Sequence, residues 1–301
     1  MEKVRIQDDL FTCVNQETLD KLVIPDDKPC VGGFQTLAEG VEKTMIDEFK
    51  AMSEAKAFPN DYFKYAVTLF DMAKNAEKKE KDGAAPSLNN LAVLNEVADF
   101  DALSKLYKTL ILKRIPLPFN IGVDTDMKNT KQHCVLIQGP STILPDASYY
   151  KEAMAQQKEM ILGIWTNIAR AIMAKTNLTP EEQNQYIEDT LAFDAVLGSL
   201  VKTSEEWSEY VEMYNPMKVS KVASYLKPVK VKNILKDLFG FVPETIIVTE
   251  PRYFKNFSLV LNENTLEQYK HWAYVTGFIN SCSLLTEELR DMGSMYYRTI
   301  A

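Results

Sequence analysis

The sequence is poor in the residues that most metal-dependent active sites use. Its 301 residues include two histidines, four cysteines and 11 glycines. Zinc hydrolysis needs ligands that converge, such as two histidines on adjacent helical turns with a glutamate between them. His133 and His271 lie far apart in the chain, so we expect each to be a packed or surface histidine. We therefore assign no catalytic residue and no metal ligand, and the substrate-binding residues stay unknown from sequence.

Paired cysteines and long apolar runs are also missing. Cys13, Cys30, Cys134 and Cys282 are scattered without a CxxC pair, which excludes a zinc framework and a disulfide-dense secreted scaffold. The first nine residues contain no apolar signal region, and no apolar run approaches the roughly 20 residues that span a bilayer. We expect reduced thiols, a cytoplasmic protein and no membrane partner.

An excess of basic charge is absent as well. The chain has 34 basic and 42 acidic residues, a net charge of −8 and a pI near 5.1. Such a surface does not attract phosphate backbones. The richest basic stretch, Lys227 to Lys236, has no interleaved aromatic residues to stack on bases and is typical of a solvated helix face. We expect no nucleic-acid partner.

Glycine-rich phosphate loops and nucleophile elbows are missing too. The sequence contains no GxGxxG, no GxxxxGK[ST] and no GxSxG. Gly32-Gly33 precedes an expected helix, where backbone amides can hold an anion. The favoured alternative is a simple turn that leads into that helix.

What the sequence does contain is helical periodicity. Two apolar stripes recur at three- or four-residue spacing, one through Leu37, Val41, Met45, Phe49 and Met52, the other through Ile161, Ile164, Trp165, Ile168 and Ile172. A third helix opens at Thr179-Pro180-Glu181-Glu182, a capping box with proline at the first helical position. Its stripe continues through Ile187, Leu191, Leu197 and Val201.

A last, long helix is expected from an Asn264 cap to the end of the chain, with Gly293 as its only possible stop. Further helices are predicted near residues 60–80, 87–97, 101–113, 204–213, 219–226 and 230–239. Short strands are predicted at 133–138 and 245–249, and we expect them to pair. Loops are predicted at 25–29, at 116–122 and at Gly139-Pro140. The fold class is mostly α, a multi-helix lobe with at most a small β ribbon and no internal linker.

Several carboxylates and tyrosines are candidate functional groups. Asp124 and Asp126 are expected in a loop, and Glu188, Asp189 and Asp194 on the third helix. Asp194 falls close to the apolar stripe, where burial would raise its pKa. A buried aspartate that holds a neighbouring helix by hydrogen bonds is favoured over a general acid. The doublets Tyr149-Tyr150 and Tyr296-Tyr297 are interpreted as core and cap contacts.

A series of short phrases runs through nearly the whole chain in a characteristic order. They are Asp9-Leu10-Phe11 through Val14-Asn15, Ile24 to Pro29 with Gly32-Gly33-Phe34, Gly139-Pro140 with Leu144-Pro145-Asp146 and Tyr149-Tyr150, Tyr214-Asn215-Pro216-Met217, and Thr265 to Tyr269. This series resembles the neprilysin-like family of zinc metalloendopeptidases, and within it the bacterial endopeptidase O type.

The resemblance implies that residues 1–301 are the N-terminal, non-catalytic region of such an enzyme. That region contributes most of a helical domain that faces a thermolysin-like domain, and the two enclose a chamber that admits short peptides. The resemblance implies zinc for the full-length enzyme, held by an HExxH motif and a downstream glutamate that this chain does not contain. The implied partners are short peptides and the missing C-terminal catalytic domain.

Two departures from the family pattern bear on the site. The usual Asn-Gly after the first helix reads Asn15-Gln16 here. In neprilysin, arginines contact the terminal carboxylate of the peptide. The matching positions here hold Cys30 and Ala38, so this arginine–carboxylate contact is not expected at those positions.

The leading hypothesis is therefore a region of a zinc metalloendopeptidase that is inactive alone. Its last helix, which runs to Ala301 without a polar tail, predicts a boundary inside a longer protein or a split gene. Such a region should expose an apolar patch larger than a few hundred Å². The alternative is a stand-alone helical binding or scaffold domain, which reading the gene beyond Ala301 would distinguish. A third hypothesis is an unrelated helical enzyme that uses Asp194 or Glu188.

Overall fold

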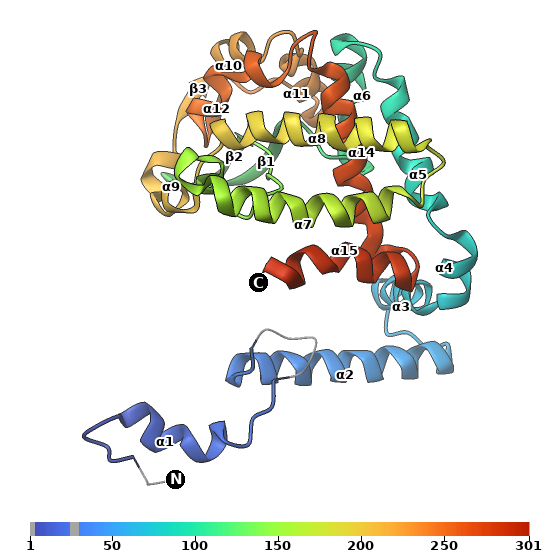
Figure 1. Cartoon of the computed structure of the whole chain (residues 1–301), viewed down its shortest axis with the longest axis vertical. Helices are drawn as coiled ribbons and strands as arrows, with labels where there is room; N and C mark the ends of the chain where they lie inside the picture. Colours follow the sequence, from blue (N-terminus) through green and yellow to red (C-terminus); the bar gives the residue numbers. More distant parts are fainter. Residues whose placement is uncertain (1–3, 25–29, 301) are drawn as a thin grey trace. The chain divides into compact units, whose positions relative to one another are not determined.

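The computed structural model describes residues 4–24 and 30–300, and Figure 1 shows the path of the chain through them. The chain forms two compact units, one that ends at Asn75 and one over Ala76–Ile300. Each unit is described by itself. The loop predicted at 25–29 lies outside the described residues.

The first unit consists of helices that bury little of their own apolar surface. They are α1 (Leu10–Leu19), α2 (Gly33–Ala55) and α3 (Asp61–Lys74). Near its end α2 packs on α3, where Phe49 meets the ring of Phe70 edge-on at 5.6 Å. The predicted stripe on α2 is present, but its first half is exposed, and neither α1 nor α2 contains a buried residue among those described.

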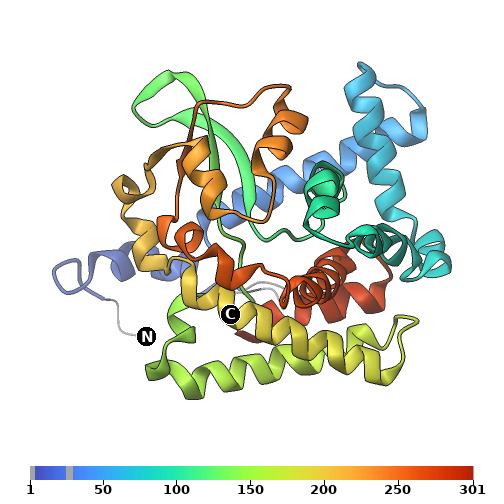
Figure 2. The same ribbon diagram turned by 90° about the horizontal axis from the view of Figure 1, so that it is seen from above.

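The second unit carries the core. Its helices begin with α4 (Ala76–Asp82), α5 (Ala85–Leu91), η1 (Ala92–Glu96), α6 (Phe100–Leu112), η2 (Ala147–Tyr150), η3 (Glu152–Met154), α7 (Ala155–Met173) and α8 (Pro180–Leu200). They continue with α9 (Ser204–Ser208), η4 (Tyr210–Met213), α10 (Val219–Tyr225), α11 (Val231–Phe239), α12 (Pro251–Lys255), α13 (Phe257–Val260), α14 (Leu266–Ser281), η5 (Cys282–Leu284) and α15 (Glu287–Ile300). Seen from above, α7 and α8 lie side by side (Figure 2).

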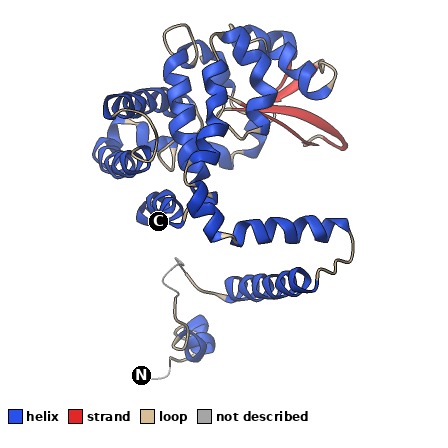
Figure 3. Ribbon diagram, turned by 90° about the vertical axis from the view of Figure 1, so that its right-hand side faces the viewer, coloured by secondary structure: helices blue, strands red, loops and turns tan. Residues whose placement is uncertain are grey.

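A small mixed sheet lies at one side of these helices (Figure 3). Its strands are β1 (Asn120–Asp126), β2 (Asn129–Gln138), β3 (Pro216–Lys218) and β4 (Thr245–Val248), in the order β1-β2-β4-β3. Leu136 pairs with Ile247 and Ile137 with Val248 in the parallel β2–β4 ladder. The predicted pairing of 133–138 with 245–249 is therefore confirmed. The fold is mostly α with a small sheet.

Three buried tyrosines hold the segment that joins α6 to β1. The hydroxyls of Tyr107 and Tyr253 donate to the carbonyls of Phe119 and Pro118, both at 2.5 Å. Tyr269 donates to the carbonyl of Pro116 at 3.3 Å. Burial raises the pKa of all three hydroxyls, which keeps them protonated donors. A proline-rich segment that lacks a full set of its own hydrogen bonds is thereby held in one conformation.

Two element boundaries differ from the prediction. The predicted loop at 116–122 gives way to strand β1, so Asp124 and Asp126 lie on a strand and not in a loop. The β1–β2 turn has no glycine. Instead, the Asp126 carboxylate accepts hydrogen bonds from the amides of Lys128 and Asn129 at 2.8 and 3.2 Å, which replaces the usual turn residues.

The last helix is not continuous as predicted. It breaks after Ser281, and α15 starts again at Glu287, where the hydroxyl of Thr286 accepts the amide of Leu289 at 3.2 Å. Gly293 is not a stop: it lies inside α15, where a Cβ would stand 2.7 Å from that of Cys282. The N-cap of α14 is Thr265 and not the predicted Asn264, and it makes no side-chain cap. The capping box at Thr179 is confirmed on α8.

Candidate functional site

Two neighbouring cavities of the second unit form the candidate site. They hold about 400 and 410 Å³ and are called the first and the second cavity. Residues 140–143 and the doublet Tyr296-Tyr297 line both of them. The first cavity lies between this wall, the segment after α6 and helices α7, α14 and α15, and the second between the wall, α9 and the start of α12.

Asp194 on α8 holds the shared wall in place. Its carboxylate accepts the amide of Ile143 at 2.9 Å and a short hydrogen bond from the hydroxyl of Tyr150. The ring of Tyr150 lies on Gly198, one turn along α8, where a Cβ would stand 2.4 Å from the ring. Burial raises the pKa of Asp194 to about 7, against the opposing effect of the two hydrogen bonds. The side chain is thus a buried structural group, and the segment that it holds runs from Ile143 to η2.

Glu250 ties together three segments around the second cavity. Its buried carboxylate accepts the amide of Gly139 at 2.6 Å and the amide of Lys202 at 2.8 Å. Burial raises the pKa of Glu250, although both amides favour the charged form. A Cβ at Gly139 would stand 3.0 Å from the carboxylate, so this residue permits the close approach.

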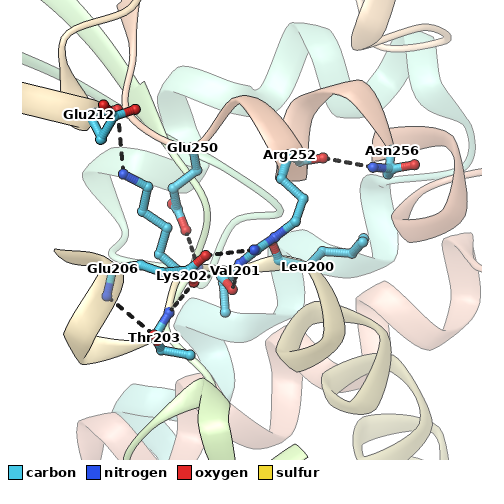
Figure 4. A network of polar contacts seen from close by, with 9 residues as sticks. All are labelled: Leu200, Val201, Lys202, Thr203, Glu206, Glu212, Glu250, Arg252 and Asn256. Atoms are coloured by element: carbon cyan, nitrogen blue, oxygen red, sulfur yellow. Dashed lines mark hydrogen bonds and ion pairs between the residues drawn. The ribbon is translucent and has the colours of Figure 1, made fainter. Parts of the chain in front are cut away.

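Arg252 joins the end of α8 to α9 (Figure 4). Its guanidinium donates to the carbonyls of Leu200 and Val201 at 3.0 and 2.7 Å and to both carboxylate oxygens of Glu206 at 2.7 and 2.9 Å. The arginine therefore supplies partners to carbonyls that the helix end leaves unpaired. The hydrogen bond from Arg252 lowers the pKa of Glu206 to about 2.

Asp146 fixes the first residue of α9. Its carboxylate accepts the amide and the hydroxyl of Ser204, both at 2.6 Å, and the amide of Ser148 at 2.8 Å. Partial burial raises its pKa, but these hydrogen bonds outweigh the effect and bring the pKa to about 2. The carboxylates around the second cavity are thus occupied by internal hydrogen bonds.

The residues considered from sequence do not converge. His271 contacts Asp189, with 2.6 Å between Nδ1 and the carboxylate, and its ring stacks on Tyr186 at 3.7 Å. His133 is exposed on β2, and Glu188 is exposed on α8. Of this group only Asp194 and the two tyrosine doublets lie at or next to the cavities.

The remaining sequence candidates are dispersed over other elements. Asp126 accepts the hydroxyl of Tyr214 at 3.1 Å, and Asp124 lies on the same strand. Gly32 is the N-cap of α2 in extended conformation. In the basic stretch, Lys230 pairs with Asp101 at 2.6 Å. The four cysteines are unpaired.

The sequence pattern alone does not single out Glu250 and Arg252 as residues of the site. Glu250-Pro251-Arg252 carries one signal that was available, because proline after a strand marks the first turn of a helix. No feature of the neighbouring sequence shows that the side chains of Glu250 and Arg252 reach residues 139, 200 and 202, because those contacts depend on the tertiary fold.

The family model of "Peptidase family M13" matches residues 6–301. The chain belongs to this family. A neutral endopeptidase of Lactococcus lactis subsp. cremoris is 30% identical over 298 residues, which cover 99% of this chain and 47% of the relative. The chain thus spans about half the length of the curated relatives that it matches.

Solved structures share the fold. The crystal structure of PEPO from Lactobacillus rhamnosis matches with a TM-score of 0.89 at 23% identity, over 99% of this chain and 47% of that one. The zinc metalloprotease ZMP1 of Mycobacterium tuberculosis, in complex with an inhibitor, matches with a TM-score of 0.85 at 23% identity, over 99% and 46%.

The name of ZMP1 implies a zinc ion. The described part of this M13 chain has no set of side chains that fits zinc. No three histidine, cysteine, aspartate or glutamate side chains group there as metal ligands would. We therefore assign no step of zinc chemistry to its residues. Among the described helices, none combines the length and the apolar character needed to cross a membrane.

Proposed function

We propose that this chain is the N-terminal, chamber-forming part of a zinc metalloendopeptidase that hydrolyses short peptides. The observation that carries the proposal is the M13 family match over residues 6–301, in a chain about half as long as its relatives. Zinc and the groups that activate water would be supplied by the C-terminal region of the full-length protein. The chain described here would supply walls that select peptides by size.

The first unit supports a partner of this kind. Leu37, Val41 and Met45 form an apolar face on α2 that is more than half exposed. Leu10, Phe11 and Val14 do the same on α1. Helices with uncovered apolar faces gain most of their stability from packing against another surface. We propose that the C-terminal catalytic region of the same protein covers these faces. The free cysteines are consistent with a cytoplasmic protein.

Hydrolysis of a quenched peptide with zinc present tests the proposal. The chain alone should show no chelator-sensitive turnover, whereas the full-length protein should cleave the peptide and lose activity on chelation. The L. lactis neutral endopeptidase serves as the positive control. Chelator-sensitive turnover by the purified 301-residue chain, or none by the full-length protein, would overturn it.

A further inference from the structure

Helices α6 and α11 pack side by side in the second unit (Figure 1). They run in the same direction, as two contacts show. Asp101 at the start of α6 pairs with Lys230, which precedes α11, at 2.6 Å. Further along α6, the ammonium of Lys108 donates to the carbonyl of Asp237, near the end of α11, at 3.2 Å. The exposed side chains of the two helices therefore share one surface, which we call the basic face.

The basic face differs in charge from the molecule as a whole. Residues 100–112 and 227–242, which form it, contain two aspartates, no glutamate and six lysines. All six lysines are exposed: Lys105, Lys108, Lys227, Lys230, Lys232 and Lys236. The whole chain carries a net charge of −8, so this surface is a local excess of positive charge.

The lysines of α11 point away from the core. Val231, Ile234 and Leu235 are buried on one side of the helix, whereas Lys232 and Lys236 lie one turn apart on its exposed side. Neither of these two lysines forms an ion pair with any residue that the structure describes. Their charge is therefore not neutralised within the described fold and is available to a partner.

Large apolar side chains lie at the end of the basic face where both helices stop. Leu112, one turn beyond Lys108 on α6, is 75% exposed. Gly240 ends α11 in the left-handed conformation with φ of 80°, and Phe241 and Val242 follow it, 60% and 40% exposed. Lysines beside exposed phenylalanine and leucine are the combination that suits the boundary between lipid headgroups and acyl chains.

The type of basic residue distinguishes between anionic partners. Residues 100–112 and 227–242 contain no arginine, the side chain that forms bidentate pairs with carboxylates of proteins and phosphates of nucleic acids. Lysine acts as a point charge on a flexible stem, which suits a layer of mobile anionic headgroups. A lipid surface also accounts for the exposed apolar end of the face, whereas a nucleic-acid backbone does not.

We propose that the basic face binds the surface of an anionic lipid bilayer. The lysines of both helices interact with the headgroups, and Leu112 and Phe241 enter the layer beneath them. The protein then lies on the bilayer, an attachment that needs no membrane-spanning helix. The stretch Lys227 to Lys236 by itself is typical of a solvated helix face. The tertiary structure adds the lysines of α6 and the apolar end.

Co-sedimentation of the 301-residue chain with vesicles tests the proposal. The probes are vesicles of phosphatidylcholine alone and vesicles in which about one third of the lipid is phosphatidylserine. The anionic vesicles should bind at least about tenfold more strongly, and raising the salt from about 0.1 M to about 0.5 M should remove most of this difference, because salt screens exposed charges. Binding through the apolar faces of the first unit would be equal for both kinds of vesicle.

Two outcomes of this assay would overturn the proposal. One is equal binding to neutral and anionic vesicles. The other is tighter binding of soluble poly-glutamate than of anionic vesicles at equal charge concentration, which would assign the basic face to an acidic protein.

A double variant tests the charge of the face. Lys232→Gln with Lys236→Gln should weaken binding to anionic vesicles about tenfold or more and leave binding to neutral vesicles unchanged. Lys131→Gln with Lys151→Gln is the matched control, because it removes the same charge from exposed lysines on β2 and after η2. Circular dichroism checks that both variants fold. No loss in the first variant, or an equal loss in the control, would contradict the assignment.

A single variant tests the apolar end. Phe241→Ser leaves the charge unchanged and should weaken binding to anionic vesicles several-fold. Tyr210→Ser on η4 is the matched control, since Tyr210 is 67% exposed and lies outside the basic face. Unaltered binding in Phe241→Ser would contradict insertion of this side chain. The vesicle assay involves no peptide cleavage, so its failure and the failure of the proposed function are distinguishable.

Discussion

Asp194 and Glu250 are two buried carboxylates that hold the wall shared by the cavities, and both accept backbone amides from distant segments. Each amide lies in a stretch without regular structure, where a side-chain acceptor replaces the missing ladder or helix partner. The local consequence is a defined wall at residues 139–143, which the two cavities share.

The raised pKa of Asp194 predicts a pH-dependent stability. A folded pKa of about 7, against 3.8 in the unfolded chain, means that the folded state keeps its proton longer. The free energy of unfolding should therefore fall as the pH rises from about 4 to about 7, by on the order of 4 kcal/mol. Asp194→Asn should remove this loss while it leaves stability at pH 4 nearly unchanged. Urea unfolding followed by tryptophan fluorescence measures it, and an identical pH profile in the variant would contradict the assignment.

Glycine is required at position 198 because the ring of Tyr150 packs directly against its Cα. In Gly198→Ala the new Cβ would meet the ring of Tyr150, whose hydroxyl then leaves Asp194. We expect a loss of about 1–3 kcal/mol in the free energy of unfolding. Gly163→Ala on α7 is the matched control, since no atom stands within 4 Å of its Cβ, and alanine there should be neutral or stabilising. Equal effects of the two variants would show that helix propensity and not the tyrosine contact decides.

At the scale of elements, Arg252 connects the end of α8 to α9 and α12. Arg252→Gln should lower the free energy of unfolding by about 1–2 kcal/mol at pH 7, because two carbonyls and Glu206 lose a charged donor. The lowered pKa of Glu206 means that its share is present above the unfolded value of 4.5 and is lost as the pH falls towards 2. The difference between wild type and variant should therefore shrink in acid, as thermal unfolding at pH 7 and pH 3 would reveal. Arg170→Gln, which changes an exposed arginine on α7, provides the baseline.

Elements with local signals were predictable, and elements defined by tertiary contacts were not. The capping box at Thr179 and the β-branched runs of β2 and β4 carry their own signals, and these elements form as expected. Strand β1 was not predictable, because the turn that follows it contains no glycine. The side chain of Asp126 closes that hairpin instead. The break after α14 was marked by Thr286-Glu287-Glu288, a cap signal inside an apparently continuous periodicity.

At the scale of the whole molecule, the exposed faces of the first unit predict self-association of the isolated chain. Light scattering should show concentration-dependent oligomers, and a dye for apolar surface should bind. The triple variant Leu37→Gln, Val41→Gln and Met45→Gln should reduce both signals. A triple variant on the polar face of α2, Glu39→Gln, Glu42→Gln and Lys43→Gln, is the control. A monodisperse wild-type chain without dye binding would contradict the expectation and favour a stand-alone domain.

The sequence by itself determined the class of the protein and most of its helices. Apolar spacing, caps and the ordered phrases are local or collinear features, which survive without knowledge of any long-range contact. Only the tertiary structure decided the candidate site. Asp194 and Glu250 lie on different elements, and each gains its role from burial and from the amides of distant segments that it accepts. Burial sets the pKa of a carboxylate and the cost of an unpaired donor, and burial is a property of the folded chain.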